Sequence, residues 1–154
     1  MHRLVASLFG VGLLLRRVRG SDAGSGTVAG LVALPLSMLI GSTSGWAGQL
    51  VAALVLTLVA YWSTAAVVAS EGDAGWIVID EAAGTFVSTI GLLGWPAVVA
   101  FVVFRVADIT KRPFPGVLRA DSIPGATGVV LDDLVAGLYA LAIGHLLSGV
   151  VFRF

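Results

Sequence analysis

The sequence has no cysteine and few charged residues. Its 154 residues include 9 Lys or Arg and 9 Asp or Glu, so that 12% are charged and the net charge is zero. The absence of cysteine excludes disulfides, thiolate metal sites and a cysteine nucleophile, and leaves no redox clue to the compartment. The chain also lacks the basic excess that nucleic-acid binding requires, so we expect no nucleic-acid partner.

Hydrophobic residues take the place of the missing charges. They make up 58% of the chain, and the mean hydropathy is +1.02, whereas soluble domains carry about 25% charged residues. The 20 glycines suit helices that pack closely within a bilayer, where small residues let backbones approach. Composition and length together predict an integral membrane protein of packed helices, with one domain over residues 1–154.

Acidic residues are concentrated in the second half of the chain. Eight of the nine lie between Glu71 and Asp133, and the last two, Asp132 and Asp133, interrupt the apolar run 128–137. An ionised carboxylate in an apolar segment costs several kcal/mol unless it is paired, protonated or bound to a metal. This pair, near the start of a helix expected over residues 128–152, therefore indicates either chemistry or a capped, solvated helix start.

The first 20 residues imitate a signal peptide. A short apolar run, 4–15, follows the amino terminus, but Arg16, Arg17 and Arg19 occupy the place of a small-residue cleavage site. We therefore expect residues 1–20 to remain as an amphipathic helix at the membrane interface.

The next apolar runs differ in length. The run 28–40 contains Pro35 and would be about 20 Å long as a helix, too short for a core of roughly 30 Å unless residues 41–45 add length, so we expect a re-entrant or tilted helix. Residues 46–69 contain no charge and are predicted to form a clear membrane span.

Two topologies remain open for residues 82–107. The segment 91–96, rich in glycine and ending in proline, predicts a break that would make a hairpin of two short helices, and the alternative is one span. A single span would separate Asp80 and Glu81 from Asp108, whereas the hairpin brings them together. The preference of Lys and Arg for cytoplasmic loops favours the hairpin, which keeps all charged loops on one side. Residues 109–126, with three prolines, are expected to form a surface loop.

Three acidic groups are candidates for a site: Asp73 with Asp80 and Glu81, then Asp108, then Asp132 with Asp133. Mg²⁺ prefers oxygen ligands and is usually held by one or two carboxylates together with substrate phosphate. The ordinary alternative for Asp80 is a helix N-cap, with Glu81 favoured by the helix dipole.

A set of charged residues at helical spacing follows: Arg105, Asp108, Lys111 and Arg112. The cations would bind phosphate next to a metal, or would form a salt-bridged set at the membrane edge. The segment 25–27 offers backbone N–H groups and the Thr27 hydroxyl to a phosphate, or forms a plain N-cap. His145 is interpreted as a helix-packing residue.

Three blocks of sequence resemble the phosphatidylglycerophosphatase A family in order and spacing: Ile77–Gly84, with Asp-Glu-x-x-Gly; Phe104–Lys111, followed by Pro113 and Pro115; and Gly128–Gly137, with Asp-Asp-x-x-Ala-Gly. The resemblance covers roughly residues 24–145. Ala107 stands where the family usually has an aromatic residue, and Arg112 is inserted between Lys111 and the first proline.

The resemblance implies a Mg²⁺-dependent phosphatase that removes the terminal phosphate of phosphatidylglycerophosphate. It also implies an all-α fold, a multihelical membrane bundle with short or re-entrant helices, in a bacterial-type cytoplasmic membrane with the active site facing the cytoplasm. The metal ligands would be Asp80, Asp132 and Asp133, with Glu81 and Asp108 as further ligand, base or orienting group. Phosphate would be bound by Arg105, Lys111, Arg112 and Thr27.

Several alternatives stay open from the sequence. The substrate could be another phospholipid or an isoprenoid phosphate, and a non-enzymatic cation-conducting protein is a different class of function. The nucleophile could be water activated by the metal or an aspartate. The number of metal ions and the oligomeric state are not determined.

Overall fold

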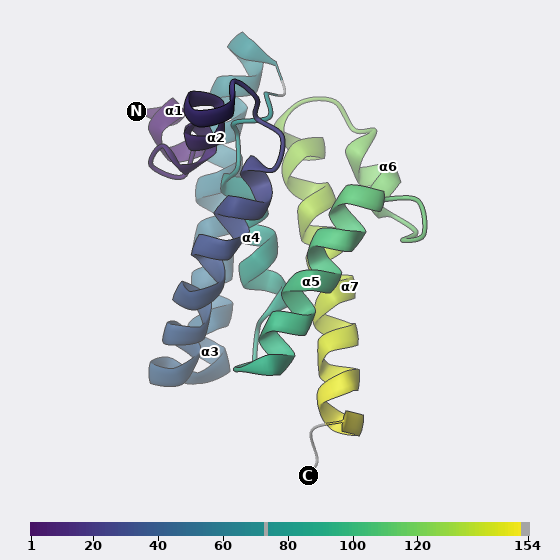
Figure 1. The fold of residues 1–154 in the computed structure, drawn as a ribbon. Coiled ribbons are helices and arrows are strands. Elements are labelled where there is room, and N and C mark those ends of the chain that lie inside the picture. The colour runs from purple at the N-terminus through teal and green to yellow at the C-terminus, as the bar shows by residue number, and fades with distance from the viewer. Residues whose placement is uncertain (73, 152–154) are drawn as a thin grey trace.

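The computed structural model describes residues 1–72 and 74–151, and every regular element within them is a helix. The predicted all-α fold is confirmed. Asp73 and Phe152 lie outside the described residues. The helices are α1 (His2–Ala6), α2 (Val11–Arg19), α3 (Ser25–Glu71), α4 (Ile79–Ser88), α5 (Trp95–Thr110), α6 (Val117–Asp121) and α7 (Ala126–Val151) (Figure 1).

Helix α3 folds back on itself. Gly45 has a non-helical backbone with φ 67° and ψ −170°, so residues 25–44 run away from α1 and α2 and residues 46–71 return toward them (Figure 1). The helix continues through residues 41–44, which makes the first arm about 30 Å long at 1.5 Å per residue. The added length removes the reason to expect a re-entrant helix here. Both α3 and α7 are long and apolar enough to cross a membrane.

The break predicted within residues 82–107 is present. Helices α4 and α5 are separate, and the turn between them contains Gly91 and Gly94 with φ of 74° and 59°, a left-handed conformation that favours glycine. The hairpin prediction is therefore confirmed and the single span is wrong. As a result, the start of α4 and the end of α5 lie at the same end of the bundle as α6 and the start of α7 (Figure 1).

Two other expectations need correction. The helix expected over residues 1–20 is divided into α1 and α2, because the backbone turns at Leu8, Phe9 and Gly10, all with positive φ. The buried Ser7 hydroxyl stabilises this turn by accepting a hydrogen bond from the Gly10 N–H at 3.1 Å. The expected loop 109–126 contains the short helix α6.

Glycines bring α4 and α7 together. A Cβ added to Gly137 would lie 2.8 Å from the Gly84 carbonyl oxygen, and a Cβ added to Gly84 would lie 3.0 Å from the Asp133 carbonyl oxygen. Larger side chains at these positions would force the backbones apart. This contact sets the start of α4 beside the second turn of α7.

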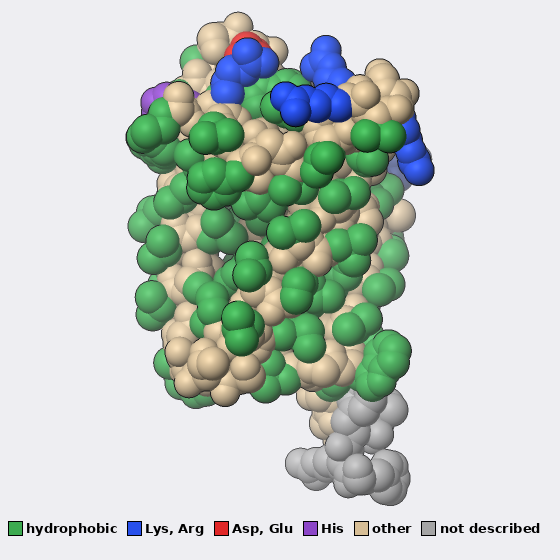
Figure 2. Space-filling model, turned by 60° about the vertical axis from the view of Figure 1, so that its left-hand side comes forward, with side chains coloured by type: hydrophobic (Ala, Val, Ile, Leu, Met, Phe, Trp, Pro, Cys, Tyr) green, Lys and Arg blue, Asp and Glu red, His purple; other side chains and the backbone are tan. Residues whose placement is uncertain are grey.

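The surface is divided between apolar sides and a charged end. Hydrophobic side chains cover the length of the face shown in Figure 2, while Lys and Arg gather at one end. Along α3, for example, Leu39, Val51 and Leu58 are exposed. An apolar belt with charge at its end suits a protein surrounded by lipid.

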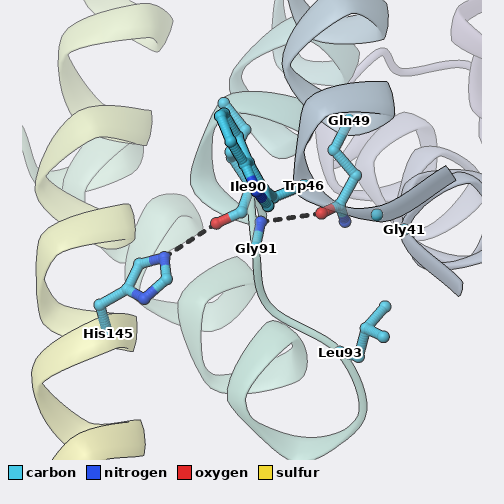
Figure 3. Close-up of a pocket in the computed structure, with 8 residues that line it drawn as sticks. Gly41, Trp46, Gln49, Ile90, Gly91, Leu93 and His145 are labelled. Atoms are coloured by element: carbon cyan, nitrogen blue, oxygen red, sulfur yellow. Dashed lines mark hydrogen bonds between the residues drawn. The ribbon is translucent and has the colours of Figure 1, made fainter.

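A buried glutamine holds the turn of the α4–α5 hairpin at the far end of the bundle. Gln49 is 1% exposed; its Oε1 accepts a hydrogen bond from the Gly91 N–H at 2.8 Å and its Nε2 donates to the Ser37 carbonyl at 3.1 Å. On the other side of the turn, His145 Nε2 donates to the Ile90 carbonyl at 2.9 Å (Figure 3). The adjacent cavity of about 450 Å³ is lined by Gln49, Ile90, Gly91, His145 and Trp46, among others, and His145 has the packing role expected of it.

We predict that Gln49→Leu destabilises the protein by about 1–3 kcal/mol, because the Gly91 N–H and the buried Ser37 carbonyl each lose a hydrogen bond to the glutamine side chain. Thermal unfolding in detergent micelles, followed by circular dichroism, would show a lower midpoint. Leu54→Ala, at an exposed position of the same arm, is the control. Equal midpoints for Gln49→Leu and the wild type would contradict the role of this glutamine.

We also predict that Gly137→Leu costs about 1–3 kcal/mol or more, since its side chain must displace the α4 backbone. Gly149→Leu is a matched control on the same helix, because an added Cβ there meets no atom within 4 Å. The unfolding midpoint should fall for the first variant and stay near the wild-type value for the second. Similar midpoints for both would show that the α4–α7 contact is not tight.

Candidate active site

Five carboxylates that the sequence pointed to meet at the charged end of the bundle. Asp80 and Glu81 come from the first turn of α4, Asp108 from the last turn of α5, and Asp132 and Asp133 from the second turn of α7. They line one cavity of about 200 Å³, together with Lys111 and Asp121. The hairpin and the glycine contact between α4 and α7 are what bring these residues, far apart in sequence, to one place.

The carboxylates fall into two groups. Oxygens of Asp80, Glu81 and Asp133 lie within 4.8 Å of one another, and so do oxygens of Asp108, Asp132 and Asp133. Asp80, Asp132 and Asp133 are buried, at 6%, 5% and 3% exposed. Neither Asp133 Oδ1 nor Glu81 Oε2 has a hydrogen-bond partner within residues 1–72 and 74–151. Buried acceptors left without donors are costly, and this donor set of oxygens alone fits a hard divalent cation.

Capping does not explain these acids. The N-cap of α4 is Val78, so Asp80 already lies inside the helix and the N-cap interpretation is wrong. Helix α7 begins at Ala126, which places Asp132 and Asp133 in its second turn and buried, so a solvated helix start is wrong as well.

Lys111 reaches into the cavity from a strained turn. Its backbone has φ 53° and ψ −46°, and the next N–H, of Arg112, donates to the Thr110 carbonyl at 2.5 Å, as in a γ-turn. This turn is rare and strained for a residue with a side chain. The Lys111 ammonium donates to Asp121 at 2.5 Å and to Asp132 at 2.6 Å. The strain is therefore compensated by contacts that aim the ammonium at the cavity.

The charge of Lys111 is secured by these two acids. Partial burial disfavours the ammonium form, but the hydrogen bonds and negative charges of Asp121 and Asp132 outweigh it and hold the pKa of Lys111 well above its ordinary value. The sequence does not indicate Asp121 as a site residue, because residues 109–126 with their three prolines predict an irregular loop. The signal present was an acid between two prolines, which does not by itself indicate a site.

Arg105 forms an ion pair with one of the five carboxylates. Its guanidinium is 2.9 Å from Asp108, one turn along α5, and Nε has no hydrogen-bond partner. A Cβ at Gly26 would collide with the Glu81 carboxylate and lie 2.9 Å from Arg105 Nη2. The start of α3 therefore packs directly against these two side chains.

Three of the four predicted phosphate-binding residues are not among the residues that line the cavity. Thr27 lies on the first turn of α3, Arg112 is exposed to solvent, and Arg105 is connected to the cavity through its ion pair with Asp108. Of the four, the structure thus places Lys111 in the cavity.

Comparisons with known proteins agree with the resemblance seen in the sequence. Residues 4–148 match the family model of phosphatidylglycerophosphatase A. A protein of Bacteroides thetaiotaomicron described as a putative phosphatidylinositol-3-phosphatase is 28% identical, and the match covers 62% of this chain and 77% of that protein. Phosphatidylglycerophosphatase A of Haemophilus influenzae is 36% identical over 46% of this chain and 45% of its own length. No solved structure matches.

The family match spans nearly the whole chain and includes every carboxylate of the cavity. The buried acids, the apolar surface and the two candidate membrane helices all agree with this family match. The chain belongs to the phosphatidylglycerophosphatase A family of membrane-bound lipid phosphatases.

Proposed function

We propose that this protein hydrolyses the terminal phosphomonoester of phosphatidylglycerophosphate, yielding phosphatidylglycerol and phosphate, and that it requires Mg²⁺. The observation that carries the proposal is the cluster of five carboxylates beside Lys111 at the charged end of an apolar bundle. A lipid in the bilayer would present its phosphate at this charged end of the bundle. The Haemophilus relative carries the name of this activity.

The chemistry of the donor set supports a magnesium ion. The cavity offers carboxylate oxygens and no nitrogen or sulfur ligand among the described residues, which is the preference of Mg²⁺. The residues that would hold it are Asp80, Glu81, Asp132 and Asp133. Bound there, Mg²⁺ supplies a Lewis acid that neutralises charge on the phosphoryl oxygens.

Lys111 has a donor left for the substrate. An ammonium has three N–H donors, and two of them are used by Asp121 and Asp132. The third is available to a phosphoryl oxygen in the cavity. In the reaction, a water oxygen attacks phosphorus, the bond from phosphorus to the glycerol oxygen breaks, and that oxygen takes up a proton. Lys111 would stabilise the negative charge that the phosphoryl group carries throughout.

The active site is proposed to face the cytoplasm. Arg16, Arg17 and Arg19 lie in the last turn of α2, which is at the same end of the bundle as the cavity (Figure 1). Lys and Arg favour cytoplasmic loops of membrane proteins, so their gathering at this end supports the assignment.

A second candidate substrate is another phospholipid phosphomonoester, such as phosphatidylinositol 3-phosphate. The name of the Bacteroides relative favours it. The same carboxylates and lysine would act on either lipid, because both present a phosphomonoester, and head-group contacts alone would distinguish them.

The first test is phosphate release by the purified chain in mixed micelles. We expect release from phosphatidylglycerophosphate with Mg²⁺ and none after chelation with EDTA, and a slower reaction with phosphatidylinositol 3-phosphate. Asp80→Asn and Asp132→Asn should each lower kcat/KM by about 100-fold or more. Glu71→Gln, which removes an acid from the same end but outside the cavity, should retain activity. Wild-type rates in both Asn variants, with normal circular dichroism, would refute the site.

A second test concerns the lysine. Lys111→Gln should lower kcat/KM by roughly tenfold to hundredfold, the value of a lost charge-assisted hydrogen bond of about 1.5–3 kcal/mol. Arg119→Gln removes the same charge from an exposed position on α6 and should change kcat/KM less than twofold. Equal effects of the two substitutions would mean that Lys111 acts only through the overall charge.

A further inference from the structure

We propose that the cavity binds two divalent cations and that Asp133 is the carboxylate they share. The proposal rests on the proposed function only for the kind of ion, a hard divalent cation. It goes further in stating how many ions bind and which residue connects them.

The arrangement of the oxygens supports two positions. The group on the α4 side contains Asp80 and Glu81, and the group on the α5 side contains Asp108 and Asp132; Asp133 is the one member common to both. Each group by itself supplies three carboxylates, which is more than one Mg²⁺ usually takes from a protein. One central ion would leave part of the set unused.

The free oxygen of Asp133 is an independent sign of a ligand. Asp132 is already engaged, since its Oδ1 accepts the Asp133 N–H at 3.0 Å and its Oδ2 accepts Lys111 at 2.6 Å. By contrast, Asp133 is 3% exposed and its Oδ1 is buried without a hydrogen-bond partner in the part of the chain that the structure describes. A carboxylate has two oxygens with about four lone-pair positions, enough to bind one ion on each side.

The charges around the cavity also indicate two divalent cations. Six carboxylates line it: Asp80, Glu81, Asp108, Asp121, Asp132 and Asp133. Among the described residues, two cations form salt bridges with them, Lys111 and Arg105. With all six carboxylates ionised, four negative charges are left, which two divalent cations would neutralise. Because Asp80, Asp132 and Asp133 are buried, an uncompensated charge of this size would be strongly unfavourable.

The experiment counts Mn²⁺, a spectroscopic substitute for Mg²⁺, on the full chain in detergent micelles without substrate. Equilibrium dialysis should give two Mn²⁺ per chain at saturation, and the low-temperature electron paramagnetic resonance spectrum should be broadened by magnetic coupling between the two ions. One Mn²⁺ per chain, or two with the separate six-line signals of isolated ions, would overturn the proposal.

Variants identify the shared ligand. Glu81→Gln and Asp108→Asn should each retain one Mn²⁺ without magnetic coupling, whereas Asp133→Asn should weaken the binding of both ions by more than tenfold. Glu71→Gln is the control and should still bind two. If Asp133→Asn keeps one ion at wild-type affinity, Asp133 is not shared. Should that variant fail to fold by circular dichroism, the other two decide, since loss of both ions or of neither in each of them contradicts two separate positions.

This test can fail independently of the proposed function. A chain that binds two coupled Mn²⁺ but releases no phosphate from any phospholipid would refute the function and leave the two-ion site. A chain that hydrolyses phosphatidylglycerophosphate with one ion bound would do the reverse.

Discussion

The close backbone contact between α4 and α7 is the constraint on which the site depends. Gly84 and Gly137 let the two helices approach to a separation that side chains would prevent. The acids of α4 are then beside those of α7, and Phe104 packs over Gly84 to bring α5 against the same pair. Without this contact, Asp80 and Asp133 would belong to separate helix surfaces, and the three-carboxylate group formed by Asp80, Glu81 and Asp133 would not exist.

The site is also built from unfavourable elements that compensate one another. Buried carboxylates repel each other and lose hydration, while Lys111 adopts a strained backbone to reach the buried Asp132 and the exposed Asp121. Such a cluster needs compensating cations, and it lies at the charged end of the bundle and not in the apolar middle. At the opposite end, Gln49 and His145 bind backbone groups of the hairpin turn.

Sequence reasoning went furthest where a single chemical pattern left few alternatives. Asp132 and Asp133 in an apolar run, and the Gly91–Pro96 break, led to the acids and to the hairpin that unites them. It failed where local signals were weak. The turn at Leu8 and Phe9 uses positive φ in residues that rarely adopt it, so the helix over 1–20 looked continuous. The sequence does not indicate Asp121, because a helix as short as α6 between two prolines leaves no helical pattern to recognise.

By itself, the sequence determined the membrane class, the helical content and the identity of the five acids, because hydropathy, glycine content and misplaced charge are local properties. Tertiary structure decided which acids share a group, that Lys111 faces them, and that Arg112 and Thr27 do not line the cavity. Those facts depend on how two helix backbones meet at Gly84 and Gly137 and on the rotation of each helix about its axis. Distances between side chains on different helices are set by packing, which no single stretch of the chain encodes.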